Sequence, residues 1–343
     1  MGGGPPGSSL LPALNVCRRP VRAPTHGSRA FGETEKTEPA VCCCSSGLEA
    51  IQSMSQATRL RERIRRGDLL VGVGARDALE ARLIENAGFD FVWASGFAIS
   101  ASYALPDASI LSMTELLEAT RSMCGRVNIP IVADCDTGFG NANNVIYAVD
   151  EFGKAGAAAI SIEDKKFPKD TSLLPGGRQE LVSIEEFSGK VLAAVDARQG
   201  SGLVIIARTE ALIAGWGVEE ALSRAHHYAE AGADCILVHS KSNTPDEVVE
   251  FVERWDGSAP LVIVPTSYPT LTERDVRRLG KIKLVIYANQ VLRAGVKAQE
   301  ELLSEIKRAG GIDTIDDWMV PVSRIFELQG VTRMKDNEAK YLP

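Results

Sequence analysis

The sequence predicts a (β/α)₈ barrel of the TIM type, and three observations indicate this fold class. Short apolar runs recur eight times after residue 68, at a spacing of roughly 20 to 40 residues that leaves room for a helix between strands. The runs consist mostly of Val, Ile, Ala and Leu, which is typical of parallel strands covered on both faces. Amphipathic helical patterns separate the runs. Eight repeats of strand and helix fit a closed barrel.

The predicted strands cover residues 70–74, 89–95, 129–134, 157–163, 203–208, 235–239, 261–265 and 284–287. The clearest helical pattern follows Gly217, because the apolar residues of 218–229 fall on one helix face. A doubly wound open sheet is the alternative fold. We disfavour it because no GxGxxG motif follows the first predicted strand.

The composition excludes several classes of protein. The 343 residues carry a net charge of −7, with 45% hydrophobic and 24% charged residues, as in ordinary globular proteins. Lys and Arg form no stripe interleaved with aromatic residues, which argues against nucleic-acid binding. No apolar run approaches the roughly 20 residues needed to cross a bilayer. The seven cysteines include no CxxC pair, so we expect reduced thiols and a cytoplasmic protein.

Residues 1–53 differ from the rest of the chain. They are rich in Gly, Pro and Ser, show no periodicity, and contain four arginines before the first acidic residue, Glu33. Such a composition buries too little apolar surface to offset chain entropy. We expect a disordered extension, or an upstream start that precedes Met54. A transit peptide, which would direct the protein to an organelle, is the alternative. Residues 54–343 form the predicted barrel domain with C-terminal helices.

Polar residues stand at the carboxyl ends of seven predicted strands. In a barrel these ends meet at one mouth, where enzymes of this fold have their active sites. The sequence therefore predicts an active site there, drawn from Ser95 and Gly96, Asp134 and Asp136, Glu163 and Asp164, Arg208 and Glu210, His239 and Ser240, Thr266, and Asn289.

Three of these acids form a candidate metal site. Asp134 and Asp136 lie on the same face of an extended chain, about 7 Å apart along it, and Glu163 comes from the neighbouring strand. Acids this close raise one another's pKa unless a cation neutralises them, and carboxylate ligands suit Mg²⁺ or Mn²⁺. Alternatively, the acids cap the following helices or pair with Lys165 and Arg208. For Asp164 alone we prefer that structural interpretation.

Two further features favour an anionic substrate and a closing lid. Arg208 can bind a carboxylate or phosphoryl group with two hydrogen bonds, and His239 stands at the end of the next strand. The stretch 165–179 is irregular and contains Pro and Gly, which is typical of a mobile lid over a barrel mouth. Residues 169–171 form its predicted tip.

Four motifs together carry a resemblance to a known family. They are Trp93-Ala94-Ser95-Gly96-Phe97, the run DCDTGFGN from Asp134 to Asn141, the run EDKKFPK from Glu163 to Lys169, and the run ARTEA from Ala207 to Ala211. In these motifs the chain resembles the isocitrate lyase/phosphoenolpyruvate mutase superfamily, over residues 58–343. The resemblance implies a (β/α)₈ barrel that exchanges its last helix with a neighbour and assembles as a homotetramer.

Within this superfamily the lid distinguishes the branches. Isocitrate and methylisocitrate lyases carry a catalytic Cys in a Lys-Cys-Gly-His lid sequence, and this lid has no Cys. Mutases place Asn two positions after the lid Lys, where this chain has Thr171. Thr171 and the segments 100–103, 106–107 and 177–181 resemble the branch that hydrolyses phosphonopyruvate. The resemblance therefore implies metal-dependent hydrolysis of the C–P bond of 3-phosphonopyruvate, giving pyruvate and phosphate.

The resemblance also implies a role for each site residue. Asp134 would bind Mg²⁺ (or Mn²⁺ or Co²⁺) directly, with waters of the metal held by Asp107, Asp136 and Glu163. The pyruvyl end of the substrate would lie at Ser95, Gly96 and Phe97. The residues expected to act on the phosphonyl group are Lys169, Thr171, Arg208 and His239, and Trp93 and Ser240 complete the predicted substrate-binding set.

Two other functions remain open. A phosphoenolpyruvate mutase returns the phosphoryl group to the enolate oxygen and excludes water. A non-catalytic barrel that binds a 2-oxo acid is the second alternative, against which the intact carboxylates and the retained Lys169 argue. We interpret Thr171, which is shorter than Asn, as making room for, or orienting, the water that attacks phosphorus.

Overall fold

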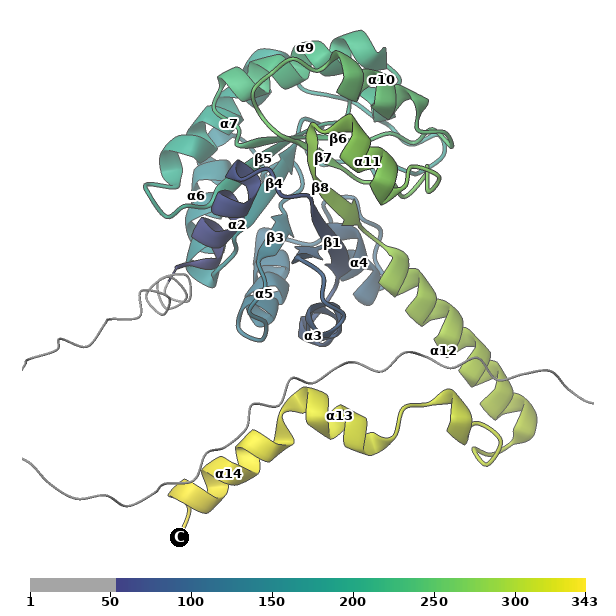
Figure 1. Cartoon of the computed structure of the whole chain (residues 1–343). Coiled ribbons are helices and arrows are strands. Elements are labelled where there is room, and N and C mark those ends of the chain that lie inside the picture. Colours follow the sequence, from purple (N-terminus) through teal and green to yellow (C-terminus); the bar gives the residue numbers. More distant parts are fainter. Residues whose placement is uncertain (1–53) are drawn as a thin grey trace, which may run out of the picture. The chain divides into compact units, whose positions relative to one another are not determined.

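The computed structural model describes residues 54–343, and the expectations for residues 1–53 lie outside this part of the chain. Within it, eight parallel strands close into a barrel in chain order, which confirms the predicted fold (Figure 1). The strands are β1 Leu70–Ala75, β2 Phe91–Ala94, β3 Ile131–Asp134, β4 Ala159–Glu163, β5 Val204–Thr209, β6 Cys235–Val238, β7 Leu261–Ile263 and β8 Ile282–Tyr287.

Strand β1 closes the barrel because it pairs on both sides. Gly72 lies opposite Phe91 of β2, and Leu70 lies opposite Leu284 of β8. This closure rules out the doubly wound open sheet. The glycines of β1 serve close packing, since a Cβ on Gly72 would lie 2.2 Å from the ring of Phe91 and a Cβ on Gly74 would lie 1.9 Å from the carbonyl oxygen of Ala288.

Helices follow the strands in the expected alternation. They are α2 Gln56–Arg65, α3 Ala78–Asn86, α4 Gly96–Ser102, α5 Met113–Cys124, α6 Ala142–Ala155, α7 Ile184–Ala197, α8 Ala211–Ala214, α9 Gly217–Glu230, α10 Asp246–Arg254, α11 Glu273–Leu279, α12 Gln290–Ala309, α13 Val322–Gln329 and α14 Val331–Tyr341, with a 3₁₀ turn at Asp316–Trp318. The helix predicted at 218–229 is α9, which buries the side chains of Ala221, Leu222, Ala225 and Tyr228.

The apolar core has two layers, as the (β/α)₈ architecture requires. The inner layer fills the barrel with side chains such as Phe91, Val132, Ile206 and Leu237, and it includes Leu60 and Ile64 of α2. The outer layer lies between the strands and the surrounding helices. Because parallel strands are buried on both faces, their apolar runs show no alternation with polar residues.

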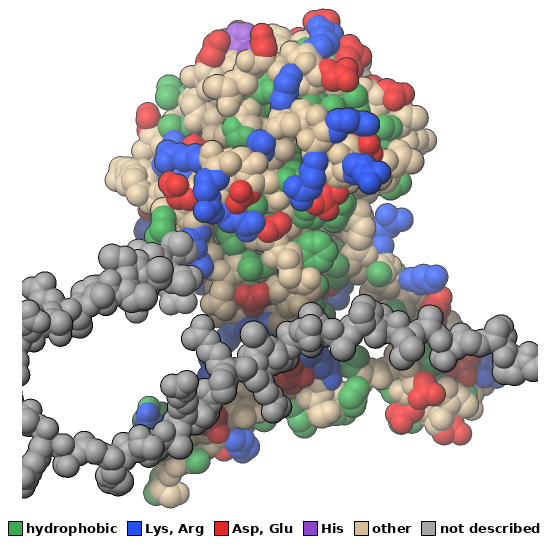
Figure 2. Space-filling model, in the orientation of Figure 1, with side chains coloured by type: hydrophobic (Ala, Val, Ile, Leu, Met, Phe, Trp, Pro, Cys, Tyr) green, Lys and Arg blue, Asp and Glu red, His purple; other side chains and the backbone are tan. Residues whose placement is uncertain are grey.

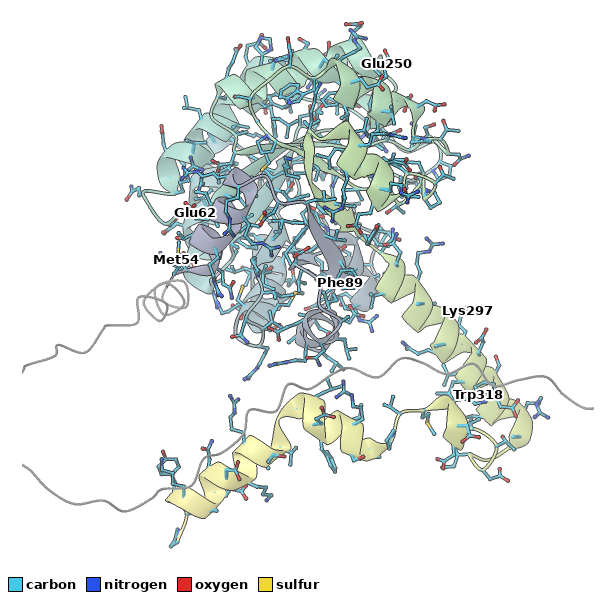
Figure 3. The ribbon with its side chains drawn as sticks, in the orientation of Figure 1. Met54, Glu62, Phe89, Glu250, Lys297 and Trp318 are labelled. Atoms are coloured by element: carbon cyan, nitrogen blue, oxygen red, sulfur yellow. The ribbon has the colours of Figure 1, made fainter. Side chains whose placement is uncertain are left out.

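The C-terminal helices behave differently from the others. Helix α12 has 20 residues but buries only Leu292, and neither α13 nor α14 has a buried residue. In Figure 3 Lys297 lies along α12 and Trp318 lies beyond it, in the segment that leads to α13. Trp318, Val322 and Phe326 are each at least half exposed. Apolar side chains of this C-terminal segment therefore stay exposed on the chain itself.

Candidate active site

Four functional side chains extend from the carboxyl ends of neighbouring strands. Asp134 ends β3, Glu163 ends β4, Arg208 is the penultimate residue of β5, and His239 follows β6. All four are buried, and Glu163 lies in register with Arg208. The strands thus bring together the residues that the sequence predicts at the mouth.

The aspartates lie against the start of α4. The backbone N–H of Gly96 donates to Asp134 Oδ2 at 3.3 Å. A Cβ on Gly96 would come within 3.2 Å of the Asp134 carboxylate and 3.3 Å of that of Asp136, so glycine keeps this space open. Asp136 has a positive φ of 49°, a strained conformation for a residue other than glycine, and such strain is typical of functional sites.

The donor set fits a hydrated divalent metal. Both carboxylate oxygens of Glu163 are buried without a hydrogen-bond partner, although Arg208 Nε lies 3.3 Å from one of them. Within residues 54–343, no three His, Cys, Asp or Glu side chains converge closely enough to ligate one ion together. A single direct carboxylate with further acids at a distance suits Mg²⁺, which retains several waters in protein sites.

The pKa values of the aspartates show how crowded the negative charge is. Burial, together with the neighbouring Asp136, raises the pKa of Asp134 to about 7 although Lys169 opposes the shift. The pKa of Asp136 is likewise raised by burial, and by Asp107 and Glu163. Burial is thus the largest cause of the raised pKa of both acids and neighbouring carboxylates add to it, and a cation at the cluster would oppose the rise.

The lid lies closed over this cluster. Its stem is formed by a bridge between Lys165 and Leu181. At its tip the ammonium group of Lys169 is buried, 2.7 Å from Asp136 and 3.0 Å from Asp107. Burial alone would lower the pKa of Lys169, but the charges of Asp107 and Asp136 outweigh it and hold the pKa well above its usual range. Lys169 is thus a fixed cation at the carboxylate cluster.

Thr171 also contacts the site. Its hydroxyl donates to the carbonyl oxygen of Asp107 at 2.8 Å, and a hydroxyl that donates once can still accept a hydrogen bond. Asp170 lies between these two residues but serves the lid itself, because its carboxylate accepts from the backbone of Arg178 at 2.7 Å. The structure therefore brings Lys169 and Thr171 to the cluster, and Asp170 has a structural contact.

Arg208 and His239 lie side by side, with Arg208 Nη2 2.9 Å from His239 Nδ1. Arg208 Nε donates to Glu210 at 2.6 Å and Nη2 donates to Ser172 at 3.1 Å, so two of its three nitrogens are engaged before any substrate binds. His239 Nε2 is buried without a partner. Burial, with the nearby charge of Arg208, lowers the pKa of His239 and keeps the imidazole neutral at pH 7.

The remaining predicted site residues have different surroundings. Ser95 caps α4 by accepting from Ala98, and Phe97 is partly exposed at the same helix start. Trp93 is buried in the inner core of the barrel. The hydroxyl of Ser240 donates to Glu247 at 2.6 Å and forms no hydrogen bond with Arg208 or His239. Substrate contacts of these residues stay predictions.

Asp164 has the structural role that we preferred, although with different partners. It accepts hydrogen bonds from Arg224 at 3.0 Å and Tyr228 at 2.8 Å, both on α9, and from the backbone of Glu210. The side chains of Lys165 and Arg208, the partners expected from the sequence, form no ion pair with Asp164, and Arg208 meets it only through the backbone, where the Asp164 N–H donates to the Arg208 carbonyl oxygen at 3.2 Å. A salt bridge between strand end and helix depends on helix packing, which the sequence pattern does not reveal.

The sequence reasoning missed the importance of Glu210, Lys165 and Ser172. Glu210 was predicted only as one of the polar residues at a strand end, yet its fully buried carboxylate contacts both Lys165 and Ser172. Burial alone would raise the pKa of Glu210, but the charges of Arg208 and Lys165 hold it well below its usual range. The available signal was the position of this acid, directly after Arg208 and Thr209 in a strand-end motif.

Comparison with known proteins places the chain in a family. Residues 60–307 match the family described as phosphoenolpyruvate phosphomutase. The chain belongs to this family. It is 53% identical, over 84% of its length and 100% of the relative's, to phosphonopyruvate hydrolase from Variovorax sp. (strain Pal2).

Two solved structures show how the family varies around one fold. Phosphoenolpyruvate phosphomutase from Streptomyces platensis subsp. rosaceus superposes with a TM-score of 0.82 at 46% identity, covering 84% of this chain and 100% of that one. A phosphonopyruvate hydrolase in complex with oxalate and Mg²⁺ superposes with a TM-score of 0.80 at 51% identity and the same coverage. The backbone fold is therefore shared by both activities, and side chains must distinguish them.

Proposed function

We propose that this chain is a Mg²⁺-dependent enzyme that hydrolyses the C–P bond of 3-phosphonopyruvate to pyruvate and phosphate. The observation that carries the proposal is Thr171, which stands in the closed lid where mutases have Asn and whose hydroxyl contacts the carbonyl of Asp107. The identity of 53% to a phosphonopyruvate hydrolase supports the same activity.

The carboxylate cluster is the proposed metal site. Asp134 would bind Mg²⁺ directly, and Asp107, Asp136 and Glu163 would hold its hydration shell, which the unpartnered oxygens of Glu163 support. Bound Mg²⁺ supplies a Lewis acid that polarises the substrate carbonyl and stabilises the enolate charge that develops when the bond breaks. The space kept by Gly96 next to both aspartates suits the pyruvyl end of the substrate, with Ser95 and Phe97 beside it.

The phosphonyl group then lies among Arg208, His239 and Lys169. Their hydrogen-bond donors balance the negative charge of the phosphoryl group while it is transferred. The transition state of such a transfer is loose, so catalysis depends mainly on positioning and on electrostatic stabilisation. His239, neutral at pH 7, presents an imidazole nitrogen and adds no further positive charge. The lid excludes bulk water, and so a single positioned water can react.

Hydrolysis requires one water at phosphorus. Its oxygen forms the new P–O bond, the C–P bond breaks, and the electron pair of that bond stays on carbon as pyruvate enolate. The two protons of the water balance the step, since one stays on the phosphate and the other is equivalent to the proton that the enolate carbon takes up to give pyruvate. The Thr171 hydroxyl has acceptor capacity left after donating to Asp107. We assign it the role of orienting this water, which an Asn at the same position would crowd out.

The product distinguishes this activity from the mutase alternative. The enzyme is incubated with phosphonopyruvate and Mg²⁺, the phosphorus compounds are followed by ³¹P NMR, and pyruvate is followed by ¹H NMR. We expect inorganic phosphate and pyruvate in equal amounts and no turnover after chelation of the metal. Phosphoenolpyruvate without free phosphate would identify a mutase, and absence of any product with Mg²⁺ restored would favour the non-catalytic 2-oxo-acid-binding barrel.

We also propose a homotetramer with exchanged C-terminal helices. The support is the poor burial of α12, α13 and α14 on their own chain. Figure 2 shows hydrophobic side chains among the charged ones on these segments. A neighbouring copy would cover these side chains.

For the compartment, we propose the cytoplasm. Cys124, Cys135 and Cys235 are free thiols, as in reducing compartments. No helix in residues 54–343 is both long and apolar enough to cross a membrane. The alternative is an organelle to which residues 1–53 direct the protein as a transit peptide. Removal of the transit peptide after import predicts a shorter mature chain. In mass determination of the mature N-terminus, a chain that begins at neither Met1 nor Met54 would support the transit peptide, and a chain that begins at either methionine would support the cytoplasm.

A further inference from the structure

Glu210 is the carboxylate at which the lid and the strand ends meet. Its Oε1 accepts from Arg208 Nε at 2.6 Å and lies 3.3 Å from His239 Nδ1. Its Oε2 accepts from Ser172 Oγ at 2.6 Å and lies 3.1 Å from Lys165 Nζ. One oxygen therefore contacts the proposed phosphonyl-binding side chains, and the other contacts the lid and its anchor.

The lid side of this contact depends on closure. Lys165 Nζ donates to the carbonyl oxygen of Asp170 at 2.9 Å and to Ser172 Oγ at 2.7 Å. Ser172 also accepts from Arg208 Nη2 at 3.1 Å. In an open lid Ser172 and Asp170 would leave the site, and Glu210, Lys165 and Arg208 would each lose one of these partners. Because buried charged groups are costly without their partners, the closed lid and the ordered Arg208 stabilise each other.

The strand side of the contact is rigid. The backbone N–H of Glu210 donates to Asp164 at 2.8 Å, and Asp164 is held in turn by Arg224 and Tyr228 of α9. The backbone of Glu210 is thus fixed by the barrel, whereas one partner of its side chain, Ser172, belongs to the lid. A rigid carboxylate with one mobile partner can transmit the position of that partner to the others.

We propose that Glu210 is a positioning residue. It couples closure of the lid, which consists of residues 165–179, to the orientation of Arg208 and His239. Glu210 does not touch the substrate in this role. The inference rests on the proposed function for the identity of the reaction, whereas the coupling depends only on contacts within the chain.

A double-mutant cycle on the full-length enzyme with Mg²⁺ tests the coupling. We expect Ser172→Ala to lower kcat about tenfold and Glu210→Gln to lower it about a hundredfold, with smaller changes in KM. Because both changes break one linkage, the double variant should lose no more than Glu210→Gln alone. Independent effects that multiply to about a thousandfold would overturn the proposal. Glu219→Gln is the matched control, since Glu219 is an exposed acid that pairs with Arg254.

Amide hydrogen exchange of the lid supplies a readout that needs no substrate. Glu210→Gln and Ser172→Ala should each raise exchange over residues 166–174 by at least about tenfold, and Glu219→Gln should not. Unchanged lid exchange in both variants contradicts the coupling. If Glu210→Gln fails to fold, Ser172→Ala alone still gives this answer. Raised exchange in an enzyme that forms only phosphoenolpyruvate would uphold the coupling while refuting the proposed hydrolysis.

Discussion

At the scale of single residues, the mouth of the barrel is organised by compensation of buried charge. Burial raises the pKa of Asp134 and of Asp136, and the Lys169 ammonium lies 2.7 Å from Asp136. Such contacts are favourable only when every charge has a partner. Closing the lid therefore brings a compensating cation to the acids, and a divalent metal would add a second.

Thr171 carries the distinction between hydrolase and mutase. We expect Thr171→Asn to reduce phosphate release about a hundredfold, the size of effect seen when a reacting group is misplaced by about an ångström. Phosphate and phosphoenolpyruvate are both measured by ³¹P NMR. Thr171→Ser is the matched control, because it keeps the hydroxyl and should retain most of the activity. Unchanged hydrolysis in the Asn variant would remove Thr171 from the mechanism.

His239 should make the fold sensitive to acid. Its pKa is lowered from 6.5 by burial and by Arg208, so below about pH 6.5 the unfolded chain binds a proton that the folded chain does not. Stability should therefore fall as the pH decreases from 6.5 toward the lowered pKa, and remain unaffected by this group above 6.5. Urea unfolding of wild type and His239→Asn measures the effect, and the variant should lose less stability between pH 7 and about pH 5.5. An equal loss in both proteins would contradict this assignment.

At the scale of elements, the strands were predictable and their neighbours less so. All eight predicted strands are present, with ends that shift by at most two residues, because burial on both faces leaves uninterrupted apolar runs. The convergence of Asp134, Glu163, Arg208 and His239 followed from barrel topology alone. The partners of Asp164 and the contacts of Glu210 did not, because they depend on how α9 and the lid pack, and single-sequence periodicity contains no such information.

The lid illustrates the same limit. Its irregular composition predicted a loop over the mouth, and Lys169 and Thr171 do reach the carboxylates. The sequence could not show that Lys165, two residues after β4, binds the lid by donating to the carbonyl oxygen of Asp170 and to the hydroxyl of Ser172. From the sequence, Lys165 was expected only as a possible ion-pair partner of the neighbouring acids, an interpretation that we preferred for Asp164 alone.

Helix α7 contains a buried amine that should cost stability. Lys190 is 3% exposed, with Nζ 3.4 Å from the carbonyl oxygen of Thr137 and 3.8 Å from Glu186. Burial lowers its pKa despite the attraction of Glu186. We expect Lys190→Met, which keeps the packing without the charge, to stabilise the fold by roughly 1 kcal/mol at pH 7.

The pH dependence checks the cause of that gain. Between the lowered pKa and 10.5 the folded protein binds fewer protons at Lys190 than the unfolded chain does, so wild-type stability rises with pH there. The advantage of Lys190→Met should therefore shrink in that window, as measured by urea unfolding at pH 7 and about pH 9.5. Lys297→Met, an exposed lysine on α12, is the control. A destabilised variant would mean that the bond to Thr137 outweighs desolvation.

At the scale of the whole molecule, the C-terminal helices α12 to α14 are poorly buried on their own chain. Helices such as α6 bury Val145, Ala148, Val149 and Phe152 against the strands, whereas the longer α12 buries only Leu292. The sequence periodicity of α12 to α14 predicts amphipathic helices, but it does not identify the chain on which they pack. The resemblance to the superfamily supplied that expectation, and the low burial of these helices supports it.

The apolar side chains of α13 give the most direct test of the proposed tetramer. Phe326 is half exposed on its own chain, so an interface that covers it should not tolerate a charge there. We expect Phe326→Glu to weaken association by about a hundredfold or more, because burying an unpaired carboxylate costs several kcal/mol. Sedimentation velocity over a range of concentrations should show smaller species than wild type. Leu192→Glu is the control, since Leu192 is equally exposed on α7 of the barrel and should leave the mass unchanged. If Phe326→Glu and wild type sediment identically, Phe326 is not buried in the subunit interface, and the exchanged segment must be sought in α12 or α14.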